Sequence, residues 1–258
     1  MSRISRAVTA ALSILAFAAS SAAAAPLFAP NSFWNAPLPS SAPIDPSSPA
    51  RTAAVVSEVN SEMQQRIGPW IDERSNSTPF YVVGADQPRV HVTLDSTIRS
   101  ASTLRSALSR GVPIPAGAQA AAGGDAHMTV YQPSTDTMWE FYHASSESDG
   151  WHADWGGVMQ HVSTNPGYYS NAAFDGLAPN AGWNWGSTAS SLPMIGGTVM
   201  ISELQAGHID HALAMNIPSP CSVWFSWPAQ RTDGTSSDMS NCMLEGARLQ
   251  LDPSLDLS

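Results

Sequence analysis

Residues 127–143 read HMTVYQPSTDTMWEFYH, and this stretch decides the fold class that the sequence predicts. Its two ends, residues 127–132 and 137–143, are short runs rich in β-branched and aromatic side chains, which favour strands. The residues between them, PSTD at 133–136, are typical of a turn. The two runs are therefore predicted to pair as a β-hairpin.

The alternation of side chains along a strand decides which residues of this hairpin share a face. Pairing across the turn would bring His127 onto the same face as Glu140 and Tyr142. A base, an acid and a proton donor would then lie together, which suits catalysis. The alternative is that these are satisfied polar groups on a solvated sheet face, because charged strand residues usually point toward water. The sequence leaves both interpretations open.

Further short runs of the same kind predict additional strands. These cover residues 80–83, 90–94, 198–201, 211–217 and 223–227. Two helices are predicted nearer the N-terminus. One begins at Ser48 and Pro49, a pair typical of an N-cap and a first turn, and extends to residue 65, while the other covers residues 95–110. Short, spaced strands in a chain of this size favour a mostly-β fold, here a β-sandwich that resembles a jelly roll.

The first 25 residues have the features of an export signal. Arg3 and Arg6 supply positive charge, an apolar run follows at residues 7–19, and the small residues of 20–25 offer cleavage sites. The apolar run is too short to span a membrane. The mature chain, residues 26–258, is therefore predicted to be a single secreted, extracellular domain.

The chain has no lysine, and its 21 acidic residues outnumber its 11 arginines, for a net charge of −10. Removal of the export signal removes two arginines and no acidic residue, so the mature net charge is −12. This balance argues against nucleic acid and anionic membranes as partners, because both need clustered basic side chains. It also weighs mildly against strongly anionic polysaccharides. A monomer is expected.

Cys221 and Cys242 are the only cysteines of the chain. In an oxidising compartment, a lone pair of cysteines most simply forms one disulfide. Such a bond would close a loop of about twenty residues and stabilise the fold by about 3 kcal/mol. No basic residue adjoins either cysteine in sequence, so a reactive thiolate is not expected.

Nine tryptophans favour sugar recognition, because an indole ring stacks on the apolar face of a pyranose ring. Trp151, Trp155, Trp183 and Trp185 are predicted to lie in loops rich in Gly and Asn, and they are the candidate substrate-binding residues. Trp70, by contrast, is predicted to lie in the core. The alternative for the loop tryptophans is that they only cover the edge of a sheet.

Glu140 is the first candidate for a general acid. It lies within the aromatic run WEFY, where desolvation would raise its pKa. A glycosidase needs a second carboxylate, and Asp125, Asp154 and Glu203 are the candidates. For Glu203 a structural role is preferred, because the sequence SELQ around it resembles a capping box that opens a short helix ended by Gly207.

Six of the seven histidines lie between His127 and His211, and with His152 these two are candidate catalytic residues. A polysaccharide lyase would use a His or Tyr as the base that removes the proton beside a uronate carboxylate. It would also need a cation that neutralises this carboxylate. Arg89 and Arg231 are the candidates for that role.

The sequence HIDH at 208–211 suggests a metal site, because His and Asp at close spacing can share a transition-metal ion. In a strand, however, His208 and His211 would face opposite sides, so one ion could not bind both without a bend. No cofactor is therefore expected. A bound metal is kept as an alternative, with His127, His152 and His211 as its ligands.

An ordered set of short motifs runs through the chain. These are GDAH at 124–127, WEFY at 139–142, GWHA at 150–153, GHIDHAL at 207–213 and WPA at 227–229. In these motifs the chain resembles, over most of its length, a group of secreted, largely uncharacterised bacterial proteins. A further similarity to concanavalin-like jelly rolls implies an extracellular β-rich fold. Jelly rolls of that kind include glycan lyases, glycan hydrolases and lectins, so the resemblance leaves the activity open.

Together these features predict a secreted enzyme that cleaves glycosidic bonds in a polysaccharide, with hydrolysis as the first choice and β-elimination as the second. A non-catalytic glycan-binding module is the competing interpretation. The two classes differ in where four residues lie in the folded chain. A cluster of His127, Glu140, His152 and His211 in one concave pocket favours an enzyme, whereas their dispersal favours a lectin or a structural role.

Overall fold

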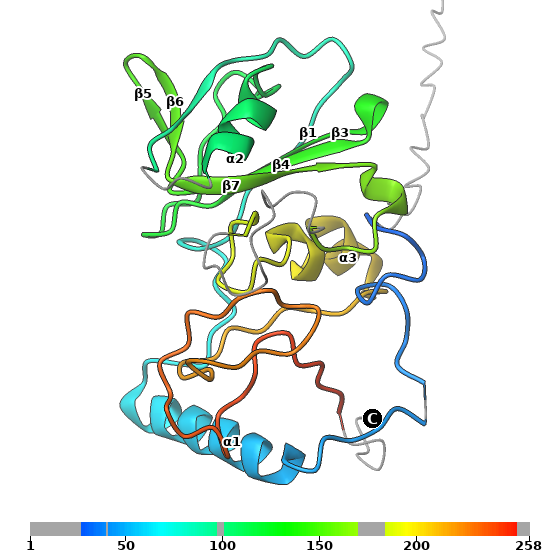
Figure 1. The fold of residues 1–258 in the computed structure, drawn as a ribbon, viewed down its shortest axis with the longest axis vertical. Coiled ribbons are helices and arrows are strands. Elements are labelled where there is room, and N and C mark those ends of the chain that lie inside the picture. Colours follow the sequence, from blue (N-terminus) through cyan, green and yellow to red (C-terminus); the bar gives the residue numbers. More distant parts are fainter. Residues whose placement is uncertain (1–26, 40, 97–100, 170–183, 252–258) are drawn as a thin grey trace, which may run out of the picture.

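The computed structural model describes residues 27–39, 41–96, 101–169 and 184–251 (Figure 1). The predicted export signal and Trp183 lie outside the described residues. None of the described helices has the length and apolar composition needed to cross a membrane.

Seven strands form two mixed sheets in this part of the chain. The four-stranded sheet has the order β1 (Phe80–Val82), β3 (Met128–Gln132), β4 (Thr137–Tyr142) and β7 (Trp155–Gln160). The three-stranded sheet has the order β2 (Val92–Leu94), β6 (Gly150–Ala153) and β5 (Ser145–Glu147). β1 pairs with β3 and β2 with β6 in parallel, and the other pairs are antiparallel. The predicted mostly-β class is confirmed. Neither of these two sheets closes on itself into a barrel.

Three α-helices accompany the sheets in the described residues: α1 (Ser48–Gln65), α2 (Ala101–Leu108) and α3 (Ile201–Ala206). α1 covers the predicted range, with Ser47 rather than Ser48 as its N-cap and Pro49 in its first turn. It lies at the far end of the molecule from the sheets, beside the C-terminal segments (Figure 1). Arg51 fixes it there by donating a hydrogen bond of 2.6 Å to the backbone carbonyl of Cys242.

Helix α3 confirms the prediction of a short helix ended by Gly207, but the capping box predicted at residues 202–205 is wrong, because these residues lie within the helix. Its N-cap is Met200, whose backbone N–H donates to the Glu203 carboxylate at 2.8 Å. Gly207 ends the helix with a φ of 77°, a conformation that favours glycine. The strand predicted over residues 198–201 is therefore wrong, because Ile201 is already the first residue of the helix.

The strands predicted over residues 211–217 and 223–227 are also wrong. Neither segment takes part in a ladder, and the bridge nearest to them joins only Cys221 to Ser236. Strand-like side chains form a strand only where another segment offers backbone hydrogen-bond partners. Residues 211–217 and 223–227 make only isolated backbone hydrogen bonds to other segments, such as those from Ala212 to Trp34 and from Ser226 to Glu245, and these do not extend into a ladder.

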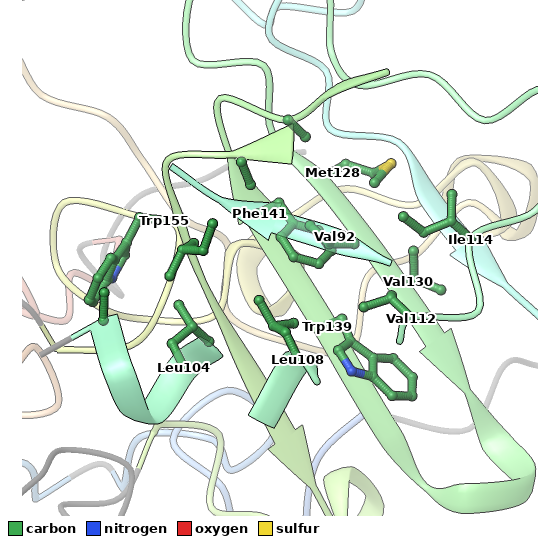
Figure 2. Packing of buried hydrophobic residues seen from close by; sticks show 14 of the residues in the cluster. Val92, Leu104, Leu108, Val112, Ile114, Met128, Val130, Trp139, Phe141 and Trp155 are labelled. Carbon is green, nitrogen blue, oxygen red and sulfur yellow. The ribbon is translucent and has the colours of Figure 1, made fainter. Parts of the chain in front are cut away.

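The main hydrophobic core lies between α2 and the sheets (Figure 2). Met128 and Val130 of β3 contribute to it, as do Trp139 and Phe141 of β4. These four side chains alternate along their strands with side chains that point to the opposite face, as the hairpin pattern requires. Leu104 of α2 is fully buried against them.

The opposite face of the four-stranded sheet is covered as well. Met138 of β4 and Met159 of β7 pack there against Phe28 and Ile195, which come from distant parts of the chain. Both faces of this sheet are therefore buried. The alternative of a solvated sheet face around Glu140 is wrong.

Two adjacent glycines allow β7 to approach its neighbours closely. A Cβ atom on Gly156 would lie 2.1 Å from the backbone oxygen of Glu140, across the pairing of β7 with β4. A Cβ atom on Gly157 would lie 2.5 Å from the ring of Tyr169. Larger side chains at either position would push the sheet and its covering segment apart.

Cys221 and Cys242 form the predicted disulfide, with an S–S distance of 1.99 Å. Replacing both by serine is expected to lower the free energy of unfolding by about 3 kcal/mol, because the unfolded chain regains the freedom that the crosslink removes. Urea-induced unfolding of this variant beside the oxidised wild type measures the difference. A thiol-labelling assay on the unfolded, unreduced wild type should find no free thiol, and two labelled thiols would contradict the pairing.

Candidate functional site

Glu140 is a fully buried carboxylate. Its Oε1 accepts a hydrogen bond from the backbone N–H of Ser187 at 2.7 Å, and its Oε2 accepts one from Met194 at 3.0 Å. Burial raises the pKa of Glu140 to about 7, and these two backbone donors oppose the increase. Glu140 thus ties residues 187–194 to β4. A substrate could reach this carboxylate only if that segment moved away.

Arg231 also holds residues 187–194 in place. The guanidinium of Arg231 donates to the backbone carbonyls of Thr188 and Ala189, at 2.5 and 3.0 Å. Arg89, the second candidate for neutralising a uronate, donates to the backbone carbonyl of Gly111 at 2.9 Å. Both guanidinium groups therefore bind the protein's own backbone.

A second group of polar side chains lies at the end of the hairpin opposite its turn. The Tyr142 cluster, as we call it, consists of Asp125, His127, Tyr142, His143 and Asp154. The strand register pairs Met128 with Phe141, so His127 comes opposite Tyr142 at the next position, and their ring centroids are 5.6 Å apart. The predicted sharing of one face by His127, Glu140 and Tyr142 is therefore confirmed.

His143 is the member of the cluster that sequence reasoning missed. Its Nδ1 lies 2.7 Å from Oδ2 of Asp154, and its ring stacks on that of Tyr142 with centroids 3.9 Å apart. The side chain is 40% exposed, and no residue in the described ranges hydrogen-bonds to its Nε2. That nitrogen is therefore open to a ligand. The only signal in the sequence is the position of His143 directly after WEFY.

The backbone around His143 has an uncommon conformation. His143 has a φ of 53° and Ala126 a φ of 42°, both in the left-handed region that residues with side chains rarely adopt. Two backbone hydrogen bonds hold them, from His143 to the carbonyl of Asp125 at 2.8 Å and from Ala144 to that of Ala126 at 3.0 Å. Such residues gather at functional sites, which makes this end of the hairpin a candidate site.

Burial and neighbouring carboxylates set the protonation states within the cluster. Burial raises the pKa of Tyr142, and three carboxylates raise it further, so the phenol stays protonated. They belong to Asp125, Asp154 and Asp233. Burial lowers the pKa of His127, although the carboxylate of Asp125, 3.8 Å from its Nε2, opposes the decrease. The cluster thus combines a protonated phenol with a neutral imidazole.

Asp233, one of the carboxylates that raise the pKa of Tyr142, interacts with Glu245, and sequence reasoning missed both acids. Burial raises the pKa of Glu245 to about 7, and the neighbouring carboxylate of Asp233 contributes to the increase. The hydroxyl of Thr232 donates to Oε1 of Glu245 at 3.3 Å. The two acids come from an irregular segment, so no strand or helix pattern could have indicated that they meet.

His152 lies on β6, in the three-stranded sheet. Its Nδ1 is 3.1 Å from Oδ2 of Asp95, and its Nε2 is 3.1 Å from Oδ1 of Asp149. The hydrogen bond with Asp95 raises the pKa of His152, and Asp149 adds to the increase. The imidazole is therefore held between two carboxylates, away from the four-stranded sheet.

His211 lies beside α3, where its Nε2 is 3.0 Å from Oε1 of Glu203. The four residues expected to share a pocket in an enzyme are therefore apart. His127 and Glu140 belong to one face of the four-stranded sheet, whereas His152 belongs to the other sheet. For these four residues, the dispersal favours a lectin or a structural role.

The histidines suggested as metal ligands do not converge either. His208 lies 3.4 Å from Asp210 on the exposed surface, and His211 has a different partner. His127, His152 and His211 occupy three separate neighbourhoods. One ion could not contact all three.

The tryptophans differ most from their predicted positions. Trp151 lies in β6 and Trp155 opens β7, so neither belongs to a loop. Trp155 is buried, and its indole N–H donates to the backbone carbonyl of Asn184 at 2.9 Å. Trp185 packs against the main core and also against the hydrophobic cluster on the opposite face of the four-stranded sheet. Trp70, predicted in the core, is 72% exposed. Among the described residues, the other exposed indoles are those of Trp224 and Trp227.

Comparisons with protein-family models, curated proteins and solved structures give no significant match. The resemblance to secreted bacterial proteins and to jelly rolls therefore stays a prediction. A function must be inferred from the geometry of the Tyr142 cluster.

Proposed function

We propose that this protein is a secreted enzyme that cleaves glycosidic bonds in a polysaccharide, with the Tyr142 cluster as its acid–base site. The observation that carries the proposal is the contact of the Tyr142 phenol with two imidazoles, those of His127 and His143. Each imidazole is paired with a carboxylate, that of Asp125 or of Asp154. Groups of this kind act as general acids and bases when they adjoin a substrate.

The cluster divides naturally into a base and an acid. His143 is the base, because Asp154 binds its Nδ1 and thereby leaves Nε2 as the proton acceptor. Tyr142 is the acid, because its raised pKa keeps the phenol protonated. His127, buried and neutral, packs beside Tyr142 and positions it. The stacked rings of Tyr142 and His143 bring acid and base to the same substrate bond.

This pairing of a phenol with an imidazole favours β-elimination over hydrolysis, which reverses the order expected from the sequence. Nε2 of His143 takes the proton from C5 of a uronate residue. The C4–O bond breaks as a C4–C5 double bond forms, and Tyr142 gives its proton to the departing oxygen. Atoms and charges balance in this scheme without a cofactor.

The substrate class follows from the shortage of positive charge. Elimination beside an ionised carboxylate needs a cation, but Arg89 and Arg231 bind backbone carbonyls and the chain has no lysine. An esterified uronate carries no charge and needs no such cation. We therefore infer a mildly acidic polyuronate with esterified carboxyl groups as the substrate.

Hydrolysis is the second candidate, and one observation favours it. Asp125 and Asp154 both raise the pKa of Tyr142, so both lie near it, and both are more than half exposed. Two carboxylates beside the scissile bond are what a glycosidase uses. The products separate the two reactions, since only elimination leaves a double bond.

Secretion and a jelly-roll arrangement belong to the same proposal. The disulfide supports an extracellular location, because such bonds persist in oxidising compartments. Two open, mixed sheets are compatible with a sandwich. A non-catalytic glycan-binding module is the alternative, which the exposed indoles of Trp224 and Trp227 would suit.

The test is an assay of the mature protein on polyuronates of high and low methyl esterification and on neutral glucans. Ultraviolet absorbance from the new double bond is expected with the esterified polymer, and little with the de-esterified one. New reducing ends without this absorbance would favour hydrolysis instead. Binding detected by tryptophan fluorescence, with no product from any polymer, would overturn the enzymatic proposal.

Asp154→Asn is expected to reduce turnover by about 10- to 100-fold, because the amide still contacts His143 but can donate to Nδ1 and so no longer holds Nε2 as the proton acceptor. Asp210→Asn is the matched control, since it alters an exposed His–Asp pair outside the cluster and should leave turnover unchanged. Thermal unfolding of both variants checks the fold. Wild-type turnover in Asp154→Asn would contradict the role of His143 as base.

A further inference from the structure

We propose that the three-stranded sheet carries a binding site for a divalent transition-metal ion, with Glu147, Asp149 and His152 as its ligands. One ligand atom of each residue lies within 4.8 Å of the ligand atoms of the other two. The site belongs to a different sheet from the Tyr142 cluster. It therefore goes beyond the proposed function and does not depend on it.

The strand register brings two of the ligands to one face of the β5–β6 hairpin. Ser145 pairs with His152 and Glu147 pairs with Gly150, so Glu147 and His152 point to the same side. Gly150, which lies opposite Glu147, has no side chain that could come between them. Asp149 belongs to the turn that connects the two strands and completes the group.

The other face of this sheet fixes the site to the protein core. Val92 and Leu94 of β2 and Ala153 of β6 are buried in the main core, and Trp151 packs against it. Because successive side chains of a strand point to opposite faces, these residues hold His152 outward on β6. Ligands carried by strands with one packed face keep their geometry better than ligands on free loops.

Asp95 adds an observation that is independent of the three ligands. Its carboxylate approaches Nδ1 of His152 at 3.1 Å, and its own backbone N–H donates to the carbonyl of Ala153 at 2.9 Å. Histidines that bind metals almost always donate their other ring N–H to a carboxylate or carbonyl. With Nδ1 occupied by Asp95, Nε2 of His152 is the nitrogen left for the ion, and it is the one that faces Asp149.

The donor set indicates the class of ion. One imidazole nitrogen and two carboxylate oxygens suit Zn²⁺, whose bonds of about 2.1 Å put the donors of a tetrahedral site roughly 3.4 Å apart. The distance from Nε2 of His152 to Oδ1 of Asp149 is 3.1 Å, close to that spacing. Ca²⁺ prefers six to eight oxygen ligands, so the same group should bind it poorly.

The test is calorimetric titration of the mature protein with ZnCl₂ and, separately, with CaCl₂. Saturable binding of about one Zn²⁺ per chain is expected, with no saturable binding of Ca²⁺. His152→Ala should abolish the binding of Zn²⁺. Asp95→Asn should weaken it by about 10- to 100-fold, as the loss of an orienting partner does at other metal sites.

His208→Ala is the matched control, because it removes a surface histidine that has a single carboxylate neighbour and should leave Zn²⁺ binding unchanged. Glu147→Gln alters only an exposed side chain, so it tests the site even if His152→Ala does not fold. Absence of Zn²⁺ binding in folded wild type would overturn the proposal. So would undiminished binding in folded Glu147→Gln, and the Asp95–His152–Asp149 group would then be only a network of ion pairs.

Discussion

Glu140→Ala is expected to lower the free energy of unfolding by about 3–5 kcal/mol. Both carboxylate oxygens accept backbone hydrogen bonds, from Ser187 at 2.7 Å and from Met194 at 3.0 Å, in a place with no exposed surface. Alanine would leave these two donors buried without acceptors and would open a cavity. Urea-induced unfolding, followed by circular dichroism, measures the loss.

Glu203→Ala is the matched control for this prediction. Glu203 also accepts a backbone N–H, that of Met200 at 2.8 Å, but it is partly exposed at the start of α3. Water can replace the lost acceptor there, so the cost should be only about 1 kcal/mol. An effect of Glu140→Ala no larger than that of Glu203→Ala would contradict the anchoring role.

The raised pKa of Glu140 also gives stability a pH dependence of definite sign. The carboxyl titrates at about 7 in the folded chain and near 4.5 when unfolded, so only the folded chain is protonated between these values. The free energy of unfolding therefore falls as the pH rises from 4.5 to about 7, by roughly 3 kcal/mol, and this contribution is constant above that range. Glu140→Gln cannot ionise and should lack this decrease.

Unfolding measured across this pH range, for wild type and Glu140→Gln, checks the prediction. The difference between the two curves isolates Glu140 from His127 and Glu245, whose pKa values are also shifted. Parallel curves would show that Glu140 does not titrate in this window. If Glu140 were the general acid, the folded Glu140→Gln variant would lose on the order of a hundredfold in turnover. If Glu140 only anchors residues 187–194, the folded variant should keep most of its turnover.

Tyr142→Phe is expected to lower turnover by about 100- to 10,000-fold while the chain stays folded. The change removes the proton that the leaving oxygen needs, but it keeps the ring that stacks on His143 at 3.9 Å and adjoins His127 at 5.6 Å. Steady-state kinetics on the esterified polyuronate measure the loss. The pKa of Tyr142 lies above its ordinary value of 10, so this residue should cause no decline in wild-type activity below that pH.

Tyr131→Phe is the matched control, because Tyr131 shares the sheet face of Tyr142 but donates to Asp136 at 2.9 Å, at the turn end of the hairpin. Burial raises the pKa of this phenol to about 12, so it is protonated as well. Turnover of Tyr131→Phe should match wild type. Equal losses in the two variants, or full activity in Tyr142→Phe, would remove Tyr142 from the acid role.

The features that the sequence alone determined are those set by contacts within a few residues. The hairpin follows from two strand-like runs and the turn at 133–136, and its two-residue period sets which side chains share a face. The short helix around Glu203 and its end at Gly207 follow from the sequence, although the capping contact joins Met200 to Glu203, two residues before the predicted box. The disulfide follows from there being only two cysteines.

The pairing of His143 with Asp154, on which the proposed function rests, depended on tertiary structure. His143 meets Asp154 because β4 pairs with β7, where Tyr142 lies opposite Trp155, and because the chain turns into the left-handed region at His143. Eleven residues separate the two partners along the chain. No periodic pattern spans that separation, so the sequence pointed to the neighbouring Glu140 instead.

Only the tertiary structure decided the environment of Glu140. The same strand pattern fits a solvated face and a covered one, and residues 187–194, about fifty positions along the chain, cover it here. For the same reason residues 211–217 and 223–227 have strand-like side chains but form no strand, since isolated backbone hydrogen bonds to neighbouring segments do not make a ladder. Local propensity sets what a segment can become, and the distant segments that pack against it decide which outcome is realised.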